Sequence, residues 1–162
     1  MTIRPARPAD WPQIWPILRD TFRAGETYAI DPEITEQAAR TYWMDSPAAC
    51  YVVEEAGQVL GTYYIRTNQA GGGAHVCNCG YMTAPEAQGR GLARAMCEAS
   101  QDQARALGYK AMQFNFVLST NIVAVGLWQR LGFEVVGQLP RAFNHPSKGL
   151  IDALVMYKWL AD

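Results

Sequence analysis

A glycine turn between a predicted strand and a predicted helix places the strongest constraint on the fold of this chain. The turn reads Gln88, Gly89, Arg90, Gly91, Leu92 and Ala93, and Arg94 follows it. A strand is predicted before it over 75–83, and apolar residues at helical spacing predict a helix over 89–107. A helix start has backbone N–H groups without intrahelical partners and the positive end of the dipole, and glycines there let phosphate oxygens approach. The turn therefore indicates phosphate binding, unless its glycines only end a loop.

Two common nucleotide-binding motifs do not fit this turn. A Walker loop needs Lys and then Ser or Thr after its last glycine, whereas Leu92 and Ala93 follow Gly91. A dinucleotide-binding unit has its glycine turn after the first strand of a parallel array and an acidic residue at the end of the next strand. The next strand of this chain ends at Leu118 and Ser119. A different phosphate-containing ligand is therefore expected.

The rest of the chain predicts a single α/β domain over residues 1–162. A chain of this length buries about 70% of the surface that its unfolded form exposes. Strands are predicted over 2–5, 50–55, 59–66, 75–83, 111–117, 133–139 and 151–159, and helices over 10–23, 33–44, 89–107 and 122–131. Asp10 is expected to cap the first helix, with Gln13 completing a capping box, and 140–146 is expected to be a loop. This order gives a mixed sheet of about seven strands with helices on both faces.

Composition and charge exclude several classes of partner. The chain has 14 Lys and Arg against 15 Asp and Glu, and no block of like charge. This balance argues against binding to nucleic acid or to a membrane surface. No stretch approaches the roughly 18 apolar residues of a membrane-spanning helix, and the N-terminus lacks the apolar segment of a signal peptide. A cytoplasmic protein is expected.

The four cysteines are interpreted as reduced thiols without a metal. His75, Cys77 and Cys79 alternate onto one face of a strand, as metal ligands can. No second cysteine or histidine pair completes a tetrahedral set, and cysteine is often buried for packing alone. No metal site is therefore predicted.

The glycine turn and a second segment resemble the GNAT superfamily of N-acetyltransferases. The family signature is Gln/Arg-x-x-Gly-x-Gly/Ala at the head of the central helix, and Gln88, Gly91 and Ala93 fill its defined positions. The family also has an Asn at the start of the following helix and an aromatic-x-x-Leu-Gly-Phe end. Here Asn121 begins that segment and 128–133 end it. The resemblance covers about 59–139 and implies the GNAT fold and an acetyl-CoA-dependent N-acetyltransferase.

The resemblance also implies where acetyl-CoA binds. The backbone amides from Gly89 to Arg94 would hold the pyrophosphate. The strand residues Tyr81, Met82 and Thr83 would splay from the neighbouring strand, so that free amides bond the pantetheine arm and the thioester oxygen, a catalytic role assigned to Met82. Asn121 would contact the pantetheine, although a helix N-cap is an equal alternative.

The groups that handle protons depart from common family patterns. Trp128 stands where many members have a Tyr, and we interpret it as a packing residue because an indole N–H is not a useful acid. Asn78 stands where related enzymes have a carboxylate, and an amide cannot be a general base. Asn78 is therefore predicted to orient the nucleophile, unless it only bonds a neighbouring loop. The thiolate leaving group, with a pKa near about 8.5, needs little acid assistance.

The acceptor is expected to be the amine of a small molecule. Asn115 shares a strand face with Gln113 and would bind either the substrate or internal partners. The asparagines 78, 115 and 121 together resemble the yeast-type acetyltransferases of proline analogues, which implies an amino or imino acid. Tyr28 would wall the site, with Glu26 and Arg141 as further candidates for the amine and a carboxylate.

Two other functions remain open, and so does the oligomeric state. The chain could instead acetylate proteins or peptides, or bind coenzyme A without turnover. Family members are often dimers, and Trp43, Trp159 or the exposed part of the final hairpin could form such a contact.

Overall fold

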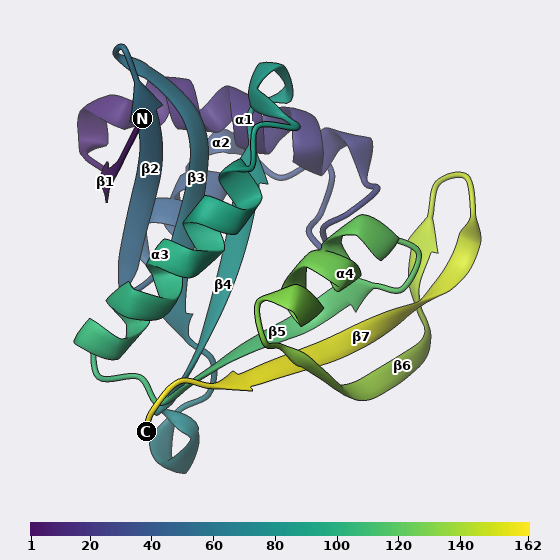
Figure 1. The fold of residues 1–162 in the computed structure, drawn as a ribbon. Coiled ribbons are helices and arrows are strands. Elements are labelled where there is room, and N and C mark those ends of the chain that lie inside the picture. The colour runs from purple at the N-terminus through teal and green to yellow at the C-terminus, as the bar shows by residue number, and fades with distance from the viewer.

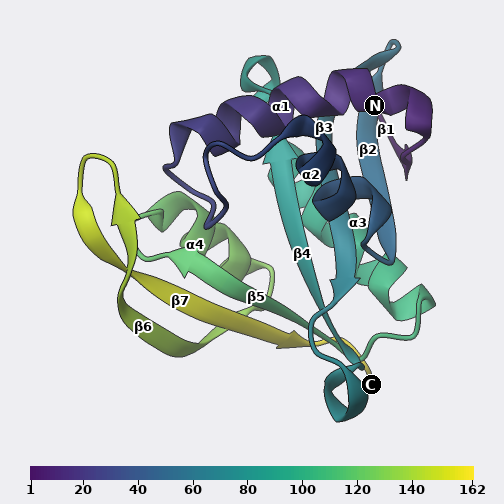
Figure 2. The same cartoon turned by 180° about the vertical axis from the view of Figure 1, so that it is seen from behind.

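The structure is a computed structural model that describes residues 1–162 and shows the α/β fold expected from the sequence. Its strands are β1 (Thr2–Pro5), β2 (Ala49–Glu55), β3 (Gln58–Thr67), β4 (Val76–Thr83), β5 (Ala111–Leu118), β6 (Glu134–His145) and β7 (Gly149–Trp159). The helices are α1 (Trp11–Ala24), α2 (Glu36–Arg40), α3 (Leu92–Ala106) and α4 (Ile122–Arg130). The seven strands form one mixed sheet in the order β1-β2-β3-β4-β5-β7-β6. Helices α3 and α4 cover one face (Figure 1) and α1 and α2 cover the other (Figure 2).

The sheet divides between β4 and β5. All other neighbouring strands are antiparallel, whereas β4 and β5 are parallel and pair only at Val76 with Ala111 and at Cys77 with Met112. Beyond the pair Cys77 and Met112 the two strands diverge toward their carboxyl ends (Figure 1). We call the end of this pairing the fork. Beyond the fork, the backbone groups of β4 and β5 that point toward each other have no strand to pair with.

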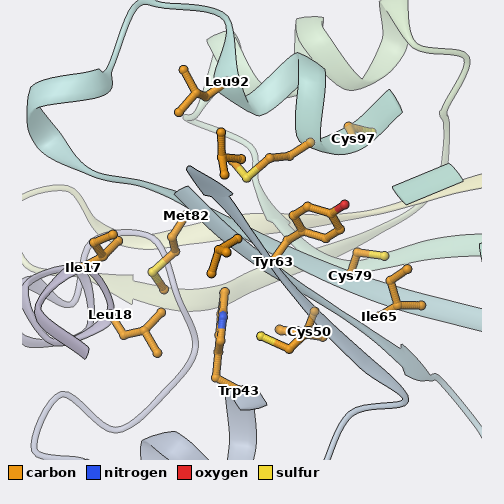
Figure 3. Close-up of a cluster of buried hydrophobic side chains, with 14 of the residues drawn as sticks. Ile17, Leu18, Trp43, Cys50, Tyr63, Ile65, Cys79, Met82, Leu92 and Cys97 are labelled. Carbon is orange, nitrogen blue, oxygen red and sulfur yellow. The ribbon is translucent and has the colours of Figure 1, made fainter. Parts of the chain in front are cut away.

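The hydrophobic core lies on both sides of β3 and β4 (Figure 3). Trp43 is completely buried there and donates its indole N–H to the hydroxyl of Thr62 at 3.1 Å. The expectation that Trp43 forms a dimer contact is therefore wrong. The four cysteines are free and buried, so Cys77 and Cys79 contribute to the packing of β4. No group of three His, Cys, Asp or Glu side chains is placed to hold a metal ion.

The start of α1 differs from the predicted capping box. The carboxylate of Asp10 accepts two hydrogen bonds from the Arg4 guanidinium, each 2.8 Å long, and a third from the backbone N–H of Arg7. Gln13 instead bonds the N–H of Val59 and the carbonyl of Gly57, which ties α1 to the β2–β3 hairpin. The predicted capping box does not form because Asp10 bonds the preceding residues Arg4 and Arg7, and Gln13 bonds a hairpin that is distant in sequence.

Two further elements differ from their predicted extent. The predicted helix over 33–44 is the short α2, followed by a π-helical turn over Thr41–Asp45. The predicted loop over 140–146 is wrong, because β6 continues to His145 with a bulge between Leu139 and Phe143. Proline cannot donate to a strand ladder, and Pro140 accordingly lies in the bulge. None of the helices is long and apolar enough to span a membrane.

Candidate functional site

The turn that leads into α3 presents a row of unoccupied backbone donors. Gly89 and Gly91 both have φ of +79°, and a Cβ placed on either residue would meet no atom within 4 Å. Every backbone N–H from Gly89 to Arg94 lacks an acceptor within the protein. The buried side chain of Leu92 anchors the turn to the core. An anionic diphosphate therefore fits this turn in both space and hydrogen-bonding capacity.

The two arginines of the turn are already ion-paired. Arg90 donates to Glu55 at 2.9 Å and Arg94 donates to Glu98 at 2.9 Å, and all four side chains are exposed by 43% or more. Exposed pairs of this kind contribute only about 0–1 kcal/mol. Phosphate oxygens can therefore replace the glutamates as partners at little cost. The side chain of Gln88 is exposed at the start of the same turn.

The backbone of β4 alternates between its two neighbours. The carbonyl of Val76 accepts from Asn68 and the N–H of Ala84 donates to Leu60, so the even-numbered residues face β3. The odd-numbered residues Cys79, Tyr81 and Thr83 therefore direct their N–H groups toward β5, and beyond the fork no strand pairs with them. This is the splaying expected for this strand.

The three strand residues assigned to acetyl-CoA do not all direct their backbone groups to the same side of β4. Tyr81 and Thr83 have backbone groups that face the divided side of the sheet. Met82 pairs with Thr62 of β3, and its side chain is buried near Ile17 and Leu18 (Figure 3). Strand alternation therefore directs the N–H of Met82 toward β3, away from the position in which a free donor was expected.

Asn78 lies at the fork with both ends of its amide engaged. The side chain is 9% exposed, its Nδ2 donates to the carbonyl of Gln113 at 2.9 Å, and its Oδ1 accepts from the hydroxyl of Tyr64 at 3.1 Å. Asn115 lies on the same face of the sheet, is exposed, and bonds the side chains of Asn68 at 2.7 Å and Gln113 at 2.9 Å. The structure thus brings Asn78 and Asn115 to one surface, and Asn115 has the internal partners that were one of its two alternatives.

Arg66 also belongs to this surface and was not identified from the sequence. Its guanidinium lies 4.2 Å from the ring centroid of Tyr42 and 4.5 Å from that of Tyr64. It donates to the carbonyl of Tyr42, and its buried Nε has no hydrogen-bond partner. Arg66 forms no ion pair. Alternation along the strand, which places Arg66 on the face of Tyr64, was the signal that could have found it.

Tyr28 pins the loop between α1 and α2 to β4. Its hydroxyl donates to the carbonyl of Tyr81 at 2.9 Å, and its ring packs edge-on against Phe22 and Trp43. Tyr28 therefore lies beside the divided strands, and its role as a wall of the substrate site stays a prediction. Glu26 and Arg141 are exposed, and Arg141 lies in the β6 bulge with φ of +52°.

Burial disfavours ionisation of three tyrosines and two cysteines around the fork. Burial raises the pKa of Tyr28, Tyr64 and Tyr81 well above the usual tyrosine range. Burial likewise raises the pKa of Cys79, and that of Cys97 to about 11. A thiolate nucleophile and a tyrosinate base are thus both unfavourable here.

Asn121 and Trp128 have structural contacts on α4. Asn121 is the N-cap, and its Oδ1 accepts from the N–H of Ala124 at 3.3 Å, which leaves its side-chain N–H groups without a partner in the protein. Trp128 packs against Tyr81 and Phe114 with ring centroids 5.4 and 5.1 Å apart. The packing assignment of Trp128 is confirmed by these contacts.

Comparison with known proteins shows that the chain is similar to several acetyltransferases. Residues 11–133 match the Acetyltransferase (GNAT) family. The chain is 30% identical to N-acetyltransferase aca1 of Schizosaccharomyces pombe, over 81% of this chain and 71% of the relative. It is 32% identical to the L-methionine sulfoximine/L-methionine sulfone acetyltransferase of Pseudomonas aeruginosa, over 86% and 84%. A GCN5-related N-acetyltransferase from Kribbella flavida is structurally similar with a TM-score of 0.92 and 45% identity, over 98% of this chain and 96% of the other.

Proposed function

Because the chain belongs to the GNAT acetyltransferase family and is an acetyl-CoA-dependent N-acetyltransferase, we propose that its acceptor is a small amine that also carries a carboxylate. An amino acid, an imino acid or an analogue of one meets this description. The Pseudomonas relative is named for two amino-acid derivatives, which supports this class. The acetyl group passes directly to the amine. Burial disfavours the thiolate that Cys79 or Cys97 would need in order to form an acetyl-cysteine intermediate.

The observation that carries the proposal is the polar surface at the fork. It consists of Arg66, Asn78, Gln113 and Asn115 on three neighbouring strands, and of Asn68 directly after β3. The surface has one cation and four amides but no acidic side chain, and its cation has no counter-ion. A guanidinium held between two aromatic rings is a strong and oriented partner for a carboxylate.

The proposed coenzyme contacts use groups that the protein leaves free. The amides from Gly89 to Arg94 hold the pyrophosphate, with Gln88 beside them, and the side-chain N–H of Asn121 reaches the pantetheine. The N–H groups of Tyr81 and Thr83 bond the pantetheine arm and the thioester oxygen, while Met82 contributes packing beneath them. Acetyl-CoA, when bound, supplies an acetyl thioester whose thiolate leaves without much acid assistance.

The residues around the acceptor orient its amine and polarise the thioester carbonyl. None of them takes a proton. Free backbone donors of β4 stabilise negative charge that develops on the carbonyl oxygen. Asn78 and Asn115 each retain hydrogen-bonding capacity beyond their internal bonds, and with Tyr28 they orient the amine. The amine proton passes to water.

The test compares acceptors that differ only in the carboxylate. Thiol release from acetyl-CoA is measured with free amino and imino acids and with the corresponding carboxamides. A charged hydrogen bond contributes about 1.5–3 kcal/mol, so kcat/KM is expected to fall by roughly 10–100-fold when the carboxylate is lost. In Arg66→Met the free acids should fall to the level of the carboxamides, and the carboxamides should be unchanged.

Other outcomes would support the remaining functions. Peptides acetylated in preference to all free amino acids would indicate a protein acetyltransferase. Tight acetyl-CoA binding with no thiol release for any amine would indicate a coenzyme-binding module. Equal turnover of acids and carboxamides would contradict the assignment of Arg66.

A further inference from the structure

The pairing of β4 with β5 ends at the rung that Asn78 occupies. Before the fork, the carbonyl of His75 accepts from the N–H groups of Lys110 and Ala111, and the last pair of the ladder is Cys77 with Met112. In a parallel ladder the next rung would join the N–H of Cys79 to the carbonyl of Gln113. That carbonyl accepts instead from Nδ2 of Asn78 at 2.9 Å.

The Asn78 side chain is held in the orientation that makes this bond. Its Oδ1 accepts from the Tyr64 hydroxyl at 3.1 Å, so its nitrogen end must face Gln113. Tyr64 lies directly over Gly80, where a Cβ would come within 2.6 Å of Cε2 of the ring. The guanidinium of Arg66 covers the same ring at 4.5 Å. The surrounding side chains therefore leave the amide one arrangement that satisfies both of its ends.

We propose that Asn78 is a positioning residue that ends the β4–β5 pairing and keeps the N–H groups of Cys79, Tyr81 and Thr83 free for the coenzyme. A side chain without a donor at this position would release the Gln113 carbonyl. The N–H of Cys79 would then bond it, the ladder would extend, and β4 would close on β5 where the thioester arm must lie.

Hydrogen exchange measured by NMR tests the inference without any acceptor. In the coenzyme-free protein, the Cys79 amide should exchange much faster than the paired Cys77 amide, and acetyl-CoA should slow the amides of Tyr81 and Thr83. In Asn78→Leu, which keeps the branching at Cγ but has no hydrogen-bond donor, Cys79 exchange should slow by about tenfold or more. The Kd of acetyl-CoA in calorimetry should rise by about tenfold or more, because the bonding groups are no longer free.

Two further variants separate this role from general damage. Gln101→Leu removes a buried amide of α3 that bonds Lys158 away from the fork, and it should leave Cys79 exchange unchanged. Tyr64→Phe removes the partner of Oδ1 while the bond to Gln113 remains possible, so Cys79 should still exchange quickly.

The inference is overturned if folded Asn78→Leu shows wild-type Cys79 exchange and wild-type acetyl-CoA affinity. If Asn78→Leu does not fold, the wild-type protein decides: a Cys79 amide as protected as that of Cys77 without coenzyme would overturn the inference. Neither readout depends on an acceptor, so failure here and failure of the proposed carboxylate specificity are distinguishable.

Discussion

At the scale of single residues, the turn before α3 leaves its backbone N–H groups free while its charged side chains are paired. The arginines of the turn before α3 are paired with glutamates, whereas the amides from Gly89 to Arg94 have no partner. Positive φ at Gly89 and Gly91 aims those amides outward and leaves the space above them open. We therefore expect an anion to bind this turn through its backbone N–H groups, with side chains in a secondary role.

Gly91→Val should remove most of the affinity for acetyl-CoA, because a side chain would occupy the approach of the phosphate oxygens. Gly57→Val is a matched control, since Gly57 has the same φ of +79° and equally empty surroundings but lies in the β2–β3 turn. Both variants should lose similar stability through backbone strain, and only Gly91→Val should lose binding in calorimetric titration. Undiminished affinity in a folded Gly91→Val protein would contradict the assignment of the turn.

At the scale of elements, close packing between neighbouring strands fixes the geometry of the fork. Gly80 of β4 pairs with Tyr64 of β3, and the absence of a side chain at Gly80 lets the tyrosine ring lie across the strand toward Asn78. At the opposite edge, Asp10 joins the start of α1 to Arg4 of β1. Each contact links elements that are formed from separate parts of the chain.

Gly80→Ala should destabilise the protein by about 1–3 kcal/mol, because the new methyl group would overlap the Tyr64 ring. Gly137→Ala on β6 is the matched strand control, since its Cβ would meet Val155 at an ordinary 3.8 Å. Urea unfolding of both variants measures the difference. Equal midpoints for the two variants would show that Tyr64 does not lie as closely over β4 as described.

Asp10→Asn should cost about 2 kcal/mol at pH 7, the magnitude of a lost charged hydrogen bond. Hydrogen bonds from Arg4 hold the pKa of Asp10 below its usual range. A lowered pKa in the folded state stabilises the protein above the unfolded pKa of about 3.9, and this contribution is lost as the pH falls through the folded pKa. Unfolding midpoints of wild type and Asp10→Asn should therefore converge below about pH 4. A difference that stays constant down to pH 2 would contradict the ion pair.

At the scale of the whole molecule, the two candidate binding surfaces lie on opposite faces of a divided sheet. The turn from Gly89 to Arg94 leads into α3, which covers one face of the sheet (Figure 1). Arg66 contacts Tyr42 in the π-helical turn that directly follows α2, and α1 and α2 cover the other face (Figure 2). Donor and acceptor are thus expected to approach the fork from opposite faces. The tyrosines and cysteines between them have raised pKa values because they are buried.

The pH dependence of kcat/KM should accordingly follow the acceptor. The rising limb is expected to move with the pKa of whichever amine is supplied, since only the neutral amine attacks. Initial rates for a series of amines with different pKa values measure this. A limb that stays near about pH 6–7 for every amine would reveal an enzyme base instead. His145 and Glu26 would then be the leading candidates.

The sequence by itself determined the features that depend on neighbouring residues. The glycine turn, the N-cap Asn121 and the hairpin of β2 and β3 all follow from residues within a few positions of each other, whereas α3 begins at Leu92 and not at the predicted residue 89. Their conformations are local, so backbone preferences and hydrophobic spacing were sufficient to predict them. The family likeness rested on the same local motifs.

Only the tertiary structure decided which groups are free and which are occupied. The bond from Asn78 to Gln113 spans 35 residues and that from Tyr28 to Tyr81 spans 53, so no local pattern could indicate either. Whether the N–H of Met82 is free depends on which neighbouring strand still pairs with β4 at that residue. Strand pairing and hydrogen bonds from side chains compete for the same backbone groups. Which of them forms is decided when the chain packs.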